Sequence, residues 1–498
     1  MSSKKYNLWF IALSTGTANI GFLFFDYNMS VFNNVLPYMK KFIFADAASG
    51  AVTFVASATV VTAAIAALLT GNLVAKFGRR SVMIWSDVVG IIGVALTLVA
   101  NLAVVIVGRL LVGVNVGITT VVVSVYFAEI PPIQYVGRAG IGLSILASFG
   151  VLSAFALGLL IPEELAPGET SQAWRVLQGI SIIFALVRIA NFLLFFKYDT
   201  PQYLIANNRY EEAEKALAQV YKEGVKEKLE ELIKERDFVS TQGTVTFFEL
   251  FTQKYRRAMI AAIVMMSIQQ LCGFNLVMVF AKTILGGGIE EGSKLPAYYS
   301  IALAGVFHCT SYTLFFFLER FNRKTLLVVG AFVLGLFEIL FGVISKATSP
   351  DNFASKIFMI LWPLPFALST GTIPNIAVPE TLPEIGVSVS LLASWIWGFL
   401  TVQFFPDISD SIGVDGTFII IGGICILSSI YFYFEVVETK GRSKVEILQE
   451  YNGTLKKGNK ISDINYNELQ LAEKKESDLE TLKPTPEAES PAAIEAQS

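Results

Sequence analysis

Three amide side chains stand close together inside a long apolar stretch near the middle of the chain. Gln269, Gln270 and Asn275 lie within residues 258–285, among Ala, Val, Ile, Leu, Met and Phe. An amide donates and accepts hydrogen bonds without a charge, so it suits a neutral ligand with several hydroxyl groups. An unpaired amide is costly in apolar surroundings, so the alternative is hydrogen bonding between packed helices. Gln269 and Asn275 are six residues apart, about 600° of helical rotation. We expect them to share one side only if the helix bends, which Gly273 permits.

Ionisable side chains inside other apolar stretches form a second group of candidates. Asp26 lies in the first stretch, Arg188 in the sixth and Glu338 in the ninth. A charge in such surroundings is expensive and marks a functional site by default. Two interpretations stay open: Asp26 pairs with Arg188, or Asp26 binds and releases a proton. The less specific alternative is that Glu338 is a structural partner and that Asp87, at the start of the third stretch, is interfacial.

The remaining reactive residue types are too few for enzyme chemistry. The chain has one histidine, His308, and three cysteines in apolar surroundings. These exclude a disulfide framework and make a metal site or a histidine-based catalytic site improbable, so we expect no enzyme, no metal and no cofactor. A net charge of −3 and a pI of about 5.6 argue against nucleic-acid binding, which needs a basic surface.

The elements that position these residues are membrane helices. Hydrophobic residues make up 54% of the 498 residues and charged residues only 16%, which is too few charges to cover a soluble protein of this size. A transmembrane helix needs about 20 apolar residues. Twelve apolar runs of this kind are approximately 8–32, 50–72, 82–100, 102–127, 139–161, 174–197, 258–285, 297–318, 325–345, 355–378, 387–407 and 416–436. The sequence therefore predicts an all-α membrane protein with two six-helix halves.

A hydrophilic middle segment separates the two halves. We expect an N-terminal half (1–198), a linker with short amphipathic helices (199–257), a C-terminal half (258–437) and a largely disordered tail (438–498). More Lys and Arg of the short loops fall on the side that also carries the linker. That side is therefore expected to be cytoplasmic, with both termini on it, and the plasma membrane is the expected location.

Basic clusters recur at equivalent places in the two halves. Arg79 and Arg80 follow the second run, and Arg323 and Lys324 follow the eighth. Such repetition is typical of secondary transporters built from internal duplications. Glu129 ends the fourth run and Glu380 the tenth, so each carboxylate can bind a basic cluster and hold the cytoplasmic mouth shut. The predicted gating network contains these residues together with Arg109, Arg138 and Glu319.

Ordered motifs carry a resemblance to a known family. They are Gln269-Gln270-Leu-Cys-Gly273-Phe-Asn275, Gly371-Thr-Ile-Pro374, Asp199-Thr-Pro-Gln-Tyr-Leu204 and Val437-Glu-Thr-Lys-Gly-Arg-Ser443. Together with the basic loops, they make residues 15–446 resemble the sugar porter family of the major facilitator superfamily. The resemblance implies alternating access between the halves, with a monosaccharide, such as the hexose glucose, bound near the membrane midplane. The implied substrate contacts are Gln269, Gln270, Asn275, Asn375, Trp395, Phe280 and Asn28.

The coupling mode follows from the first helix, which reads Phe25-Asp26-Tyr27-Asn28. Proton-coupled relatives resemble this stretch but carry Asp at the last position, whereas an amide cannot bind and release a proton. We therefore expect a facilitative uniporter. The alternatives are a symporter that couples protons to a sugar or an inositol-like polyol, and a transporter-like sugar sensor. The expected partners are the monosaccharide and the lipid bilayer, with protons under the first alternative, and the expected state is a monomer.

Overall fold

The computed structural model describes residues 5–162, 171–241, 246–290, 292–348, 351–442 and 444–453. Long helices account for most of this part of the chain. The first set is α1 (Leu8–Ser30), α2 (Phe32–Tyr38), the π-helix η2 (Met39–Ile43), α3 (Ser49–Phe77), α4 (Arg79–Thr97), α5 (Leu102–Glu129), α6 (Ile133–Leu157), the 3-10 helix η3 (Gly158–Leu160) and α7 (Ala173–Leu194).

The later elements comprise a set of short helices followed by a second set of long ones. The short ones are α8 (Pro201–Ala206), α9 (Tyr210–Val220), α10 (Val225–Thr241) and the 3-10 helix η4 (Phe248–Phe251). The rest are α11 (Arg256–Leu271), α12 (Phe274–Leu285), α13 (Leu295–Arg320), α14 (Arg323–Ala347), α15 (Phe353–Leu361), α16 (Pro363–Leu368), α17 (Ile373–Thr381), α18 (Glu384–Glu435) and α19 (Lys444–Tyr451). The all-α prediction is confirmed.

Ten helical segments within the described residues are long and apolar enough to cross a membrane. The last of them, Ile385–Glu435, contains two helices that meet at Gly413, where φ is +81°. Helix α13 is 26 residues long and is not among the ten. The arrangement accommodates the twelve predicted spans, and that number stays a prediction.

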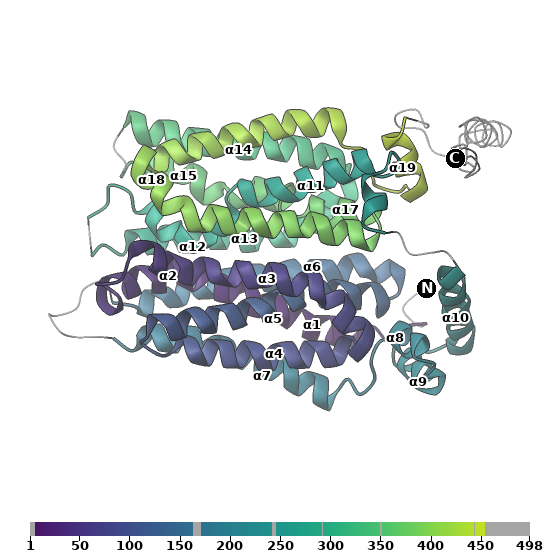
Figure 1. The fold of residues 1–498 in the computed structure, drawn as a ribbon. Helices are drawn as coiled ribbons and strands as arrows, with labels where there is room; N and C mark the ends of the chain where they lie inside the picture. The colour runs from purple at the N-terminus through teal and green to yellow at the C-terminus, as the bar shows by residue number, and fades with distance from the viewer. Residues whose placement is uncertain are drawn as a thin grey trace, which may run out of the picture.

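The helices form two layers (Figure 1). Helices α1–α7, here called the first half, lie below helices α11–α18, the second half, and the long helices of both run roughly parallel. Helices α8, α9, α10 and α19 lie together at one end of these layers, which we call the linker end. Helix α2 lies at the opposite end, which we call the far end. The predicted boundaries at residues 198 and 437 fall between these groups of elements, whereas the boundary at residue 257 falls in the first turn of α11; the division into domains stays a prediction.

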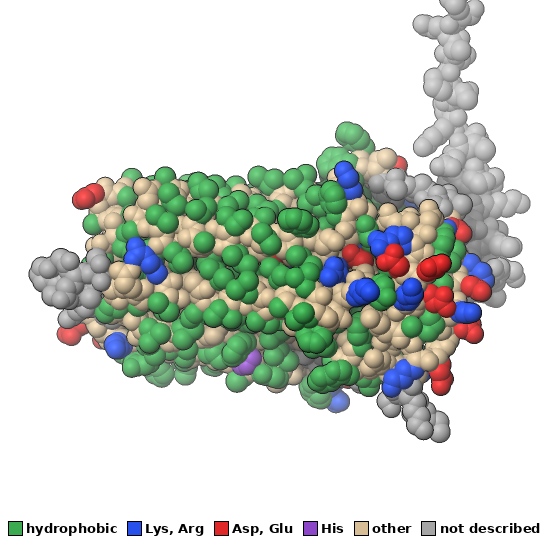
Figure 2. All heavy atoms as spheres, turned by 90° about the horizontal axis from the view of Figure 1, so that it is seen from below, with side chains coloured by type: hydrophobic (Ala, Val, Ile, Leu, Met, Phe, Trp, Pro, Cys, Tyr) green, Lys and Arg blue, Asp and Glu red, His purple; other side chains and the backbone are tan. Residues whose placement is uncertain are grey.

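The surface of the bundle is banded in the way a bilayer requires. Figure 2 shows hydrophobic side chains over the middle of one face, with Lys, Arg, Asp and Glu gathered mainly at the linker end. Large side chains exposed on the long helices include Ile65, Leu194 and Leu427, which are 55%, 75% and 68% exposed. A band of apolar side chains of this kind can contact the hydrocarbon layer of a bilayer, whereas in water it would be an unusually large apolar patch.

Small residues allow the closest helix contacts. A Cβ at Gly117 of α5 would lie 2.2 Å from the carbonyl oxygen of Ala63 in α3. A Cβ at Gly335 of α14 would lie 2.5 Å from the carbonyl oxygen of Gly422 in α18. Helices in membranes associate by such close backbone packing, because lipid supplies no hydrophobic force between them. In both halves, therefore, a glycine allows close backbone contact between a pair of long helices.

Gly117→Ala is expected to lower the melting temperature of the purified protein, because the added methyl group overlaps backbone that cannot move away. Overpacking of this kind typically costs about 1–3 kcal/mol. The matched control is Gly179→Ala in α7, where an added Cβ meets nothing within 4 Å. Equal melting temperatures for the two variants would contradict the packing between α3 and α5.

Candidate functional site

Two of the three predicted amides, Gln270 and Asn275, are hydrogen bonded to each other, and we call them the amide cluster together with the adjacent Gln269. The chain breaks between α11 and α12 at Gly273, whose φ is +87°, as the spacing of the amides required. Asn275 Nδ2 then donates to Gln270 Oε1 at 2.9 Å, and Gln270 Nε2 donates to Ser394 Oγ of α18 at 3.3 Å. All three amides are at least nine-tenths buried. The break therefore aligns side chains that an unbroken helix would point apart.

Gln269 and Asn375 meet at one backbone oxygen. Gln269 Nε2 and Asn375 Nδ2 donate to the carbonyl oxygen of Gly371, at 2.9 and 3.1 Å. Gly371 lies in the short break between α16 and α17, and Asn375 is exposed. Two broken helices, α11–α12 and α16–α17, thus present amide groups to the same place. Such breaks at membrane depth are found where backbone lines a binding cavity or is buried in protein.

An aromatic pair lies beside the amides at the boundary between the halves. Trp395 of α18 follows Ser394, and its ring centre is 6.1 Å from that of Phe25 in α1. Trp395 is 5% exposed, and within the described part of the chain its buried Nε1 has no hydrogen-bond partner. Aromatic faces of this kind pack against the C–H faces of a sugar ring, and the indole N–H usually takes a partner when buried.

Two residues next to the amides were not identified from the sequence. Ser394 accepts from Gln270, and a Cβ at Gly398 would lie 2.8 Å from Asn275 Nδ2 and 3.4 Å from Gln270 Oε1. Ser394 and Gly398 are four residues apart and lie on one face of α18. This spacing of small residues was the signal that was available in the sequence.

Two other predicted substrate contacts lie apart from the amides. Phe280 of α12 packs on Phe405, with ring centres 5.1 Å apart. Asn28 is buried in the first half, where its Nδ2 donates to the carbonyl of Phe24 at 2.8 Å and its Oδ1 accepts from Ser181 at 3.3 Å. The structure therefore does not bring Phe280 or Asn28 into the amide cluster.

The partner of Arg188 is Asp87, so the suggested pairing with Asp26 is wrong. Arg188 Nε donates to Asp87 Oδ2 at 2.7 Å, and the two side chains are 0% and 1% exposed. Asn115 Nδ2 donates to the other Asp87 oxygen at 3.2 Å. Asp87 is therefore buried inside the first half and does not lie at the membrane–water interface. Gly21 of α1 leaves the room for Arg188, because a Cβ there would meet Nη1 at 1.5 Å.

The two remaining buried carboxylates lie in different halves. Asp26 of α1 faces α6, where a Cβ at Gly150 would lie 3.5 Å from its Cβ. Glu338 of α14 is fully buried and accepts from Trp362 Nε1 at 2.8 Å. A role of Asp26 or Glu338 in coupling stays a prediction.

Two ion pairs predicted from the sequence are present at the linker end. Arg79 Nη2 lies 2.5 Å from Glu129 Oε1, and Arg323 Nη1 contacts Glu380 Oε2. Arg79 and Glu129 belong to α4 and α5, and Arg323 and Glu380 belong to α14 and α17. Each pair therefore lies within one half. They join helices of the same half and do not hold the two halves to each other.

The other predicted gate residues use backbone partners. Arg80 Nε donates to the carbonyl oxygens of Phe192 and Phe196 at 3.2 and 2.5 Å. The carbonyl oxygen of Glu319 accepts from Lys440 Nζ at 2.6 Å, and Lys324 donates its backbone N–H to Glu438 at 2.9 Å. The side chain of Arg138 lies outside the described residues.

The placement of Arg109 in the gating network is wrong. Arg109 and Glu129 are about 20 residues apart in α5, which corresponds to about 30 Å along a helix. Arg109 is 1% exposed, its Nη1 donates to the carbonyl of Asn28 at 3.1 Å, and its guanidinium lies 4.0 Å from the ring centre of Phe32. It therefore connects α5 to α1 and α2, toward the far end.

A carboxylate caps the third long helix of each half. Asp199 accepts from the backbone N–H groups of Arg79 and Arg80 at 3.0 and 3.2 Å, at the start of α4. Glu438 does the same for Arg323 and Lys324, at 3.1 and 2.9 Å, at the start of α14. Burial raises the pKa of Asp199 above its ordinary value, although these N–H groups and the Arg79 charge act in the opposite direction. Both carboxylates lie in the quoted motifs, but the sequence does not reveal what they bind.

The sequence profile of the family described as "Sugar (and other) transporter" matches residues 14–451. The chain belongs to this family. The protein is therefore a multi-pass membrane transporter, not an enzyme. The chain is 26% identical over 445 residues to plastidic glucose transporter 4 of Arabidopsis thaliana, covering 87% of this chain and 79% of that protein. It is 29% identical over 489 residues to the mouse solute carrier family 2 facilitated glucose transporter member 5, covering 91% and 93%.

Solved structures show the same fold. The transporter resembles the proton:xylose symporter XylE bound to 6-bromo-6-deoxy-D-glucose, with a TM-score of 0.74, 18% identity, and 89% of this chain and 99% of that chain covered. The inward-open conformation of the xylose transporter XylE from E. coli gives a TM-score of 0.73 at 18% identity, with 89% and 99% covered. At these identities the likeness supports the major facilitator fold.

Direct links join the halves of the transporter at the middle and toward the far end. Ser57 Oγ of α3 donates to Gln403 Oε1 of α18 at 2.6 Å, and Ser148 Oγ of α6 lies 3.0 Å from His308 Nδ1 of α13. Asn33 Oδ1 of α2 accepts the backbone N–H of Lys282 in α12 at 2.6 Å. The last of these bonds joins α2 to α12 toward the far end.

Asp199→Ala is expected to lower the melting temperature of the transporter, because it removes the acceptor of the backbone N–H groups that begin α4. Hydrogen bonds to charged groups contribute about 1.5–3 kcal/mol each. Glu438→Ala should do the same through α14. Glu212→Ala is the control, because Glu212 pairs with Arg209 on the exposed surface of α9. A melting temperature for Asp199→Ala as high as that of the control would contradict the capping role.

Proposed function

We propose that the chain carries a monosaccharide, a hexose such as glucose, across its membrane as a facilitative carrier. The amide cluster of Gln269, Gln270 and Asn275 carries this proposal, because it offers neutral donors and acceptors beside the aromatic pair at the boundary between the halves. Two relatives that are named as glucose transporters make glucose the first hexose to test.

Movement of the substrate would follow from rocking of the two halves about this cluster. The hydrogen bonds between the halves lie at the middle and toward the far end, whereas the ion pairs at the linker end stay within each half. The linker end is then the side that opens first from this conformation. We infer that it faces the cytoplasm, as the distribution of Lys and Arg suggests. We also place the carrier, as a monomer, in the plasma membrane.

The absence of a carboxylate at position 28 supports facilitation over proton coupling. The Asn28 amide is hydrogen bonded to α1 and α7 and cannot release a proton in transport. One observation favours the alternative of a proton-coupled sugar or polyol symporter. Asp26 and Glu338 are both buried carboxylates, and neither has a cationic partner among the described ion pairs. A sensor that binds sugar without carrying it is the third candidate, and a transport assay separates it from the other two.

The deciding experiment is uptake by proteoliposomes that contain the purified full-length chain. Labelled glucose should accumulate to equal concentrations inside and outside, with no change in the pH of the lumen and no effect of a protonophore. Acidification of the lumen as glucose enters would instead establish the symporter, and so would accumulation above the external concentration when an inward proton gradient is imposed. Protein-free vesicles are the control, and binding of glucose without any uptake would identify the sensor.

A further inference from the structure

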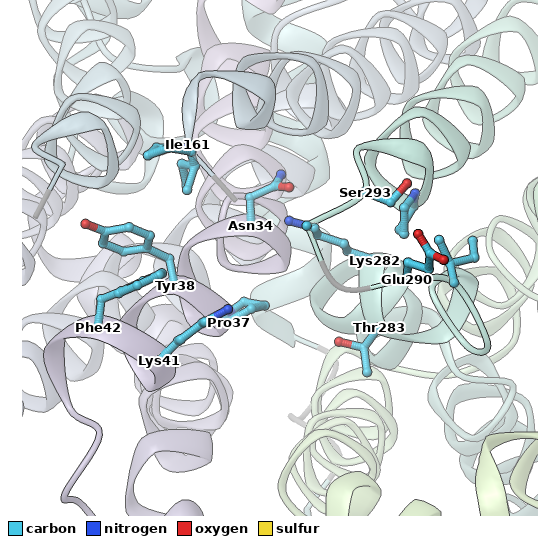
Figure 3. A pocket seen from close by; sticks show the side chains of 14 residues that line it. Asn34, Pro37, Tyr38, Lys41, Phe42, Ile161, Lys282, Thr283, Glu290 and Ser293 are labelled. Atoms are coloured by element: carbon cyan, nitrogen blue, oxygen red, sulfur yellow. The ribbon is translucent and has the colours of Figure 1, made fainter. Parts of the chain in front are cut away.

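A pocket with polar and apolar lining residues lies between the two halves at the far end, away from the amide cluster. Its volume is about 240 Å³. Asn34, Tyr38 and Phe42 line it from the first half, and Lys282, Thr283 and Ser293 from the second (Figure 3). Lys282 follows Asn275 by about seven residues in α12, or about 10 Å along the helix. The pocket is therefore a separate place on the path between the central amides and the far side.

The side chain of Asn34 needs a ligand that its surroundings do not supply. Asn34 is 2% exposed, and neither its Oδ1 nor its Nδ2 has a hydrogen-bond partner among the residues that the structure describes. A Cβ at Gly158 would lie 2.0 Å from Nδ2, so the glycine makes room for the amide and limits its movement. A buried amide without partners is costly. One hydroxyl group can donate to Oδ1 while another accepts from Nδ2, as on a sugar ring.

The rest of the lining fits a small neutral polyol. The rings of Tyr38 and Phe42 are 5.0 Å apart, and the Tyr38 hydroxyl is held by Ser171 at 2.7 Å, which fixes the ring. The charged lining residues are of both signs, Lys41, Lys282 and Glu290, and do not select one charge. Pockets for drug-sized ligands measure about 300–1,000 Å³, so this smaller volume suits a single sugar ring.

We propose that this far-end pocket is a second binding site for the transported monosaccharide, occupied at the entrance before or after the central site. The inference rests on the proposed function. The bond between Asn33 and the backbone of Lys282 joins the two halves beside the pocket. When the halves part at the far end, this bond and the pocket walls separate together. A sugar held there by Asn34 on one wall and by Thr283 or Ser293 on the other then moves on to the amides.

Equilibrium binding of tritiated D-glucose to the purified full-length chain tests the second site. The wild type should bind two glucose molecules, and Gln270→Ala should keep the component that belongs to the pocket. Adding Asn34→Ala to Gln270→Ala should weaken that component by about tenfold or more. Thr283 is exposed and lies on the opposite wall of the pocket. Thr283→Val should therefore weaken binding of the same glucose molecule while Asn34 is left in place.

The control is Asn191→Ala, which removes a part-buried amide bonded to Thr17 and should leave both components in place. A single bound glucose that Gln270→Ala abolishes would overturn the second site and leave the proposed function standing. Two components that Asn34→Ala and Thr283→Val leave unchanged would also overturn it. Binding of no monosaccharide by a wild type with a sharp melting transition would instead contradict the proposed function.

Discussion

Gln270→Ala is expected to raise the apparent KM for glucose uptake by about 5–150-fold. Gln270 accepts a hydrogen bond from Asn275 through its Oε1 and donates one to Ser394 through its Nε2, so its loss removes the proposed sugar contact and leaves two neighbours without their partner. A buried hydrogen bond whose partner is left unsatisfied costs about 1–3 kcal/mol, and 1.4 kcal/mol is a factor of ten. Labelled uptake at a series of glucose concentrations measures the effect.

The matched control for this prediction is again an amide outside the cluster. Asn191→Ala in α7 removes a 3.3 Å bond to Thr17 and should leave the KM within about a factor of two. An intermediate result is expected for Gln269→Ala, because the Gly371 oxygen keeps its bond from Asn375. If the KM of Gln270→Ala equals that of the wild type, the amides are packing contacts between helices, which is the alternative that the sequence left open.

Asp87→Ala should cause the largest loss of stability in the first half. It leaves the Arg188 guanidinium buried at 0% exposure without its counter-charge. Removing one partner of a buried ion pair costs about 3–5 kcal/mol. The melting temperature measured by size-exclusion chromatography after heating should fall strongly, and Arg188→Met should lower it too, because Asp87 is then left unpaired.

The double variant Asp87→Leu/Arg188→Met separates the charge from the packing. Replacing both charges by apolar groups of similar volume is often neutral or stabilising. Its melting temperature is therefore expected to recover most of what either single variant loses. A double variant that is as unstable as the sum of the two single ones would show that hydrogen bonds, not the opposite charges, make the main contribution: the bond from Asn115, which joins α5 to α4, and the bond from Arg188 to Ser86, which joins α7 to α4.

The membrane architecture followed from the sequence because it depends on composition, which is additive along the chain. The amide motif and Gly273 also predicted the break between α11 and α12, since the break is a local property of a glycine with positive φ. The pairing of Arg79 with Glu129 could be predicted because both residues lie at helix ends on one side of the membrane. Helix order and membrane side were enough to bring them together.

Pairings across the bundle could not be predicted in this way. The depth of Arg109 in α5 was missed because the sequence of this apolar run does not say where along the helix the bilayer begins. The sequence does not say whether Arg188 faces Asp26 or Asp87, because this depends on how α1, α4 and α7 are rotated about their axes. Close contacts of Gly21 with Arg188 and of Gly150 with the backbone of α1 fix the rotation of α1. Ser394, Gly398 and Asn34 are ordinary residues in sequence, and only their neighbours give them a role.

The location of each linker-end ion pair inside a single half has a consequence for how salt affects the protein. Screening at high ionic strength weakens partly exposed pairs such as Arg323–Glu380, whose side chains are 21% and 35% exposed. Rocking of the halves keeps Arg323 beside Glu380 and Arg79 beside Glu129, so screening acts equally before and after the movement. Added salt should therefore lower the melting temperature of the protein while leaving its turnover rate unchanged.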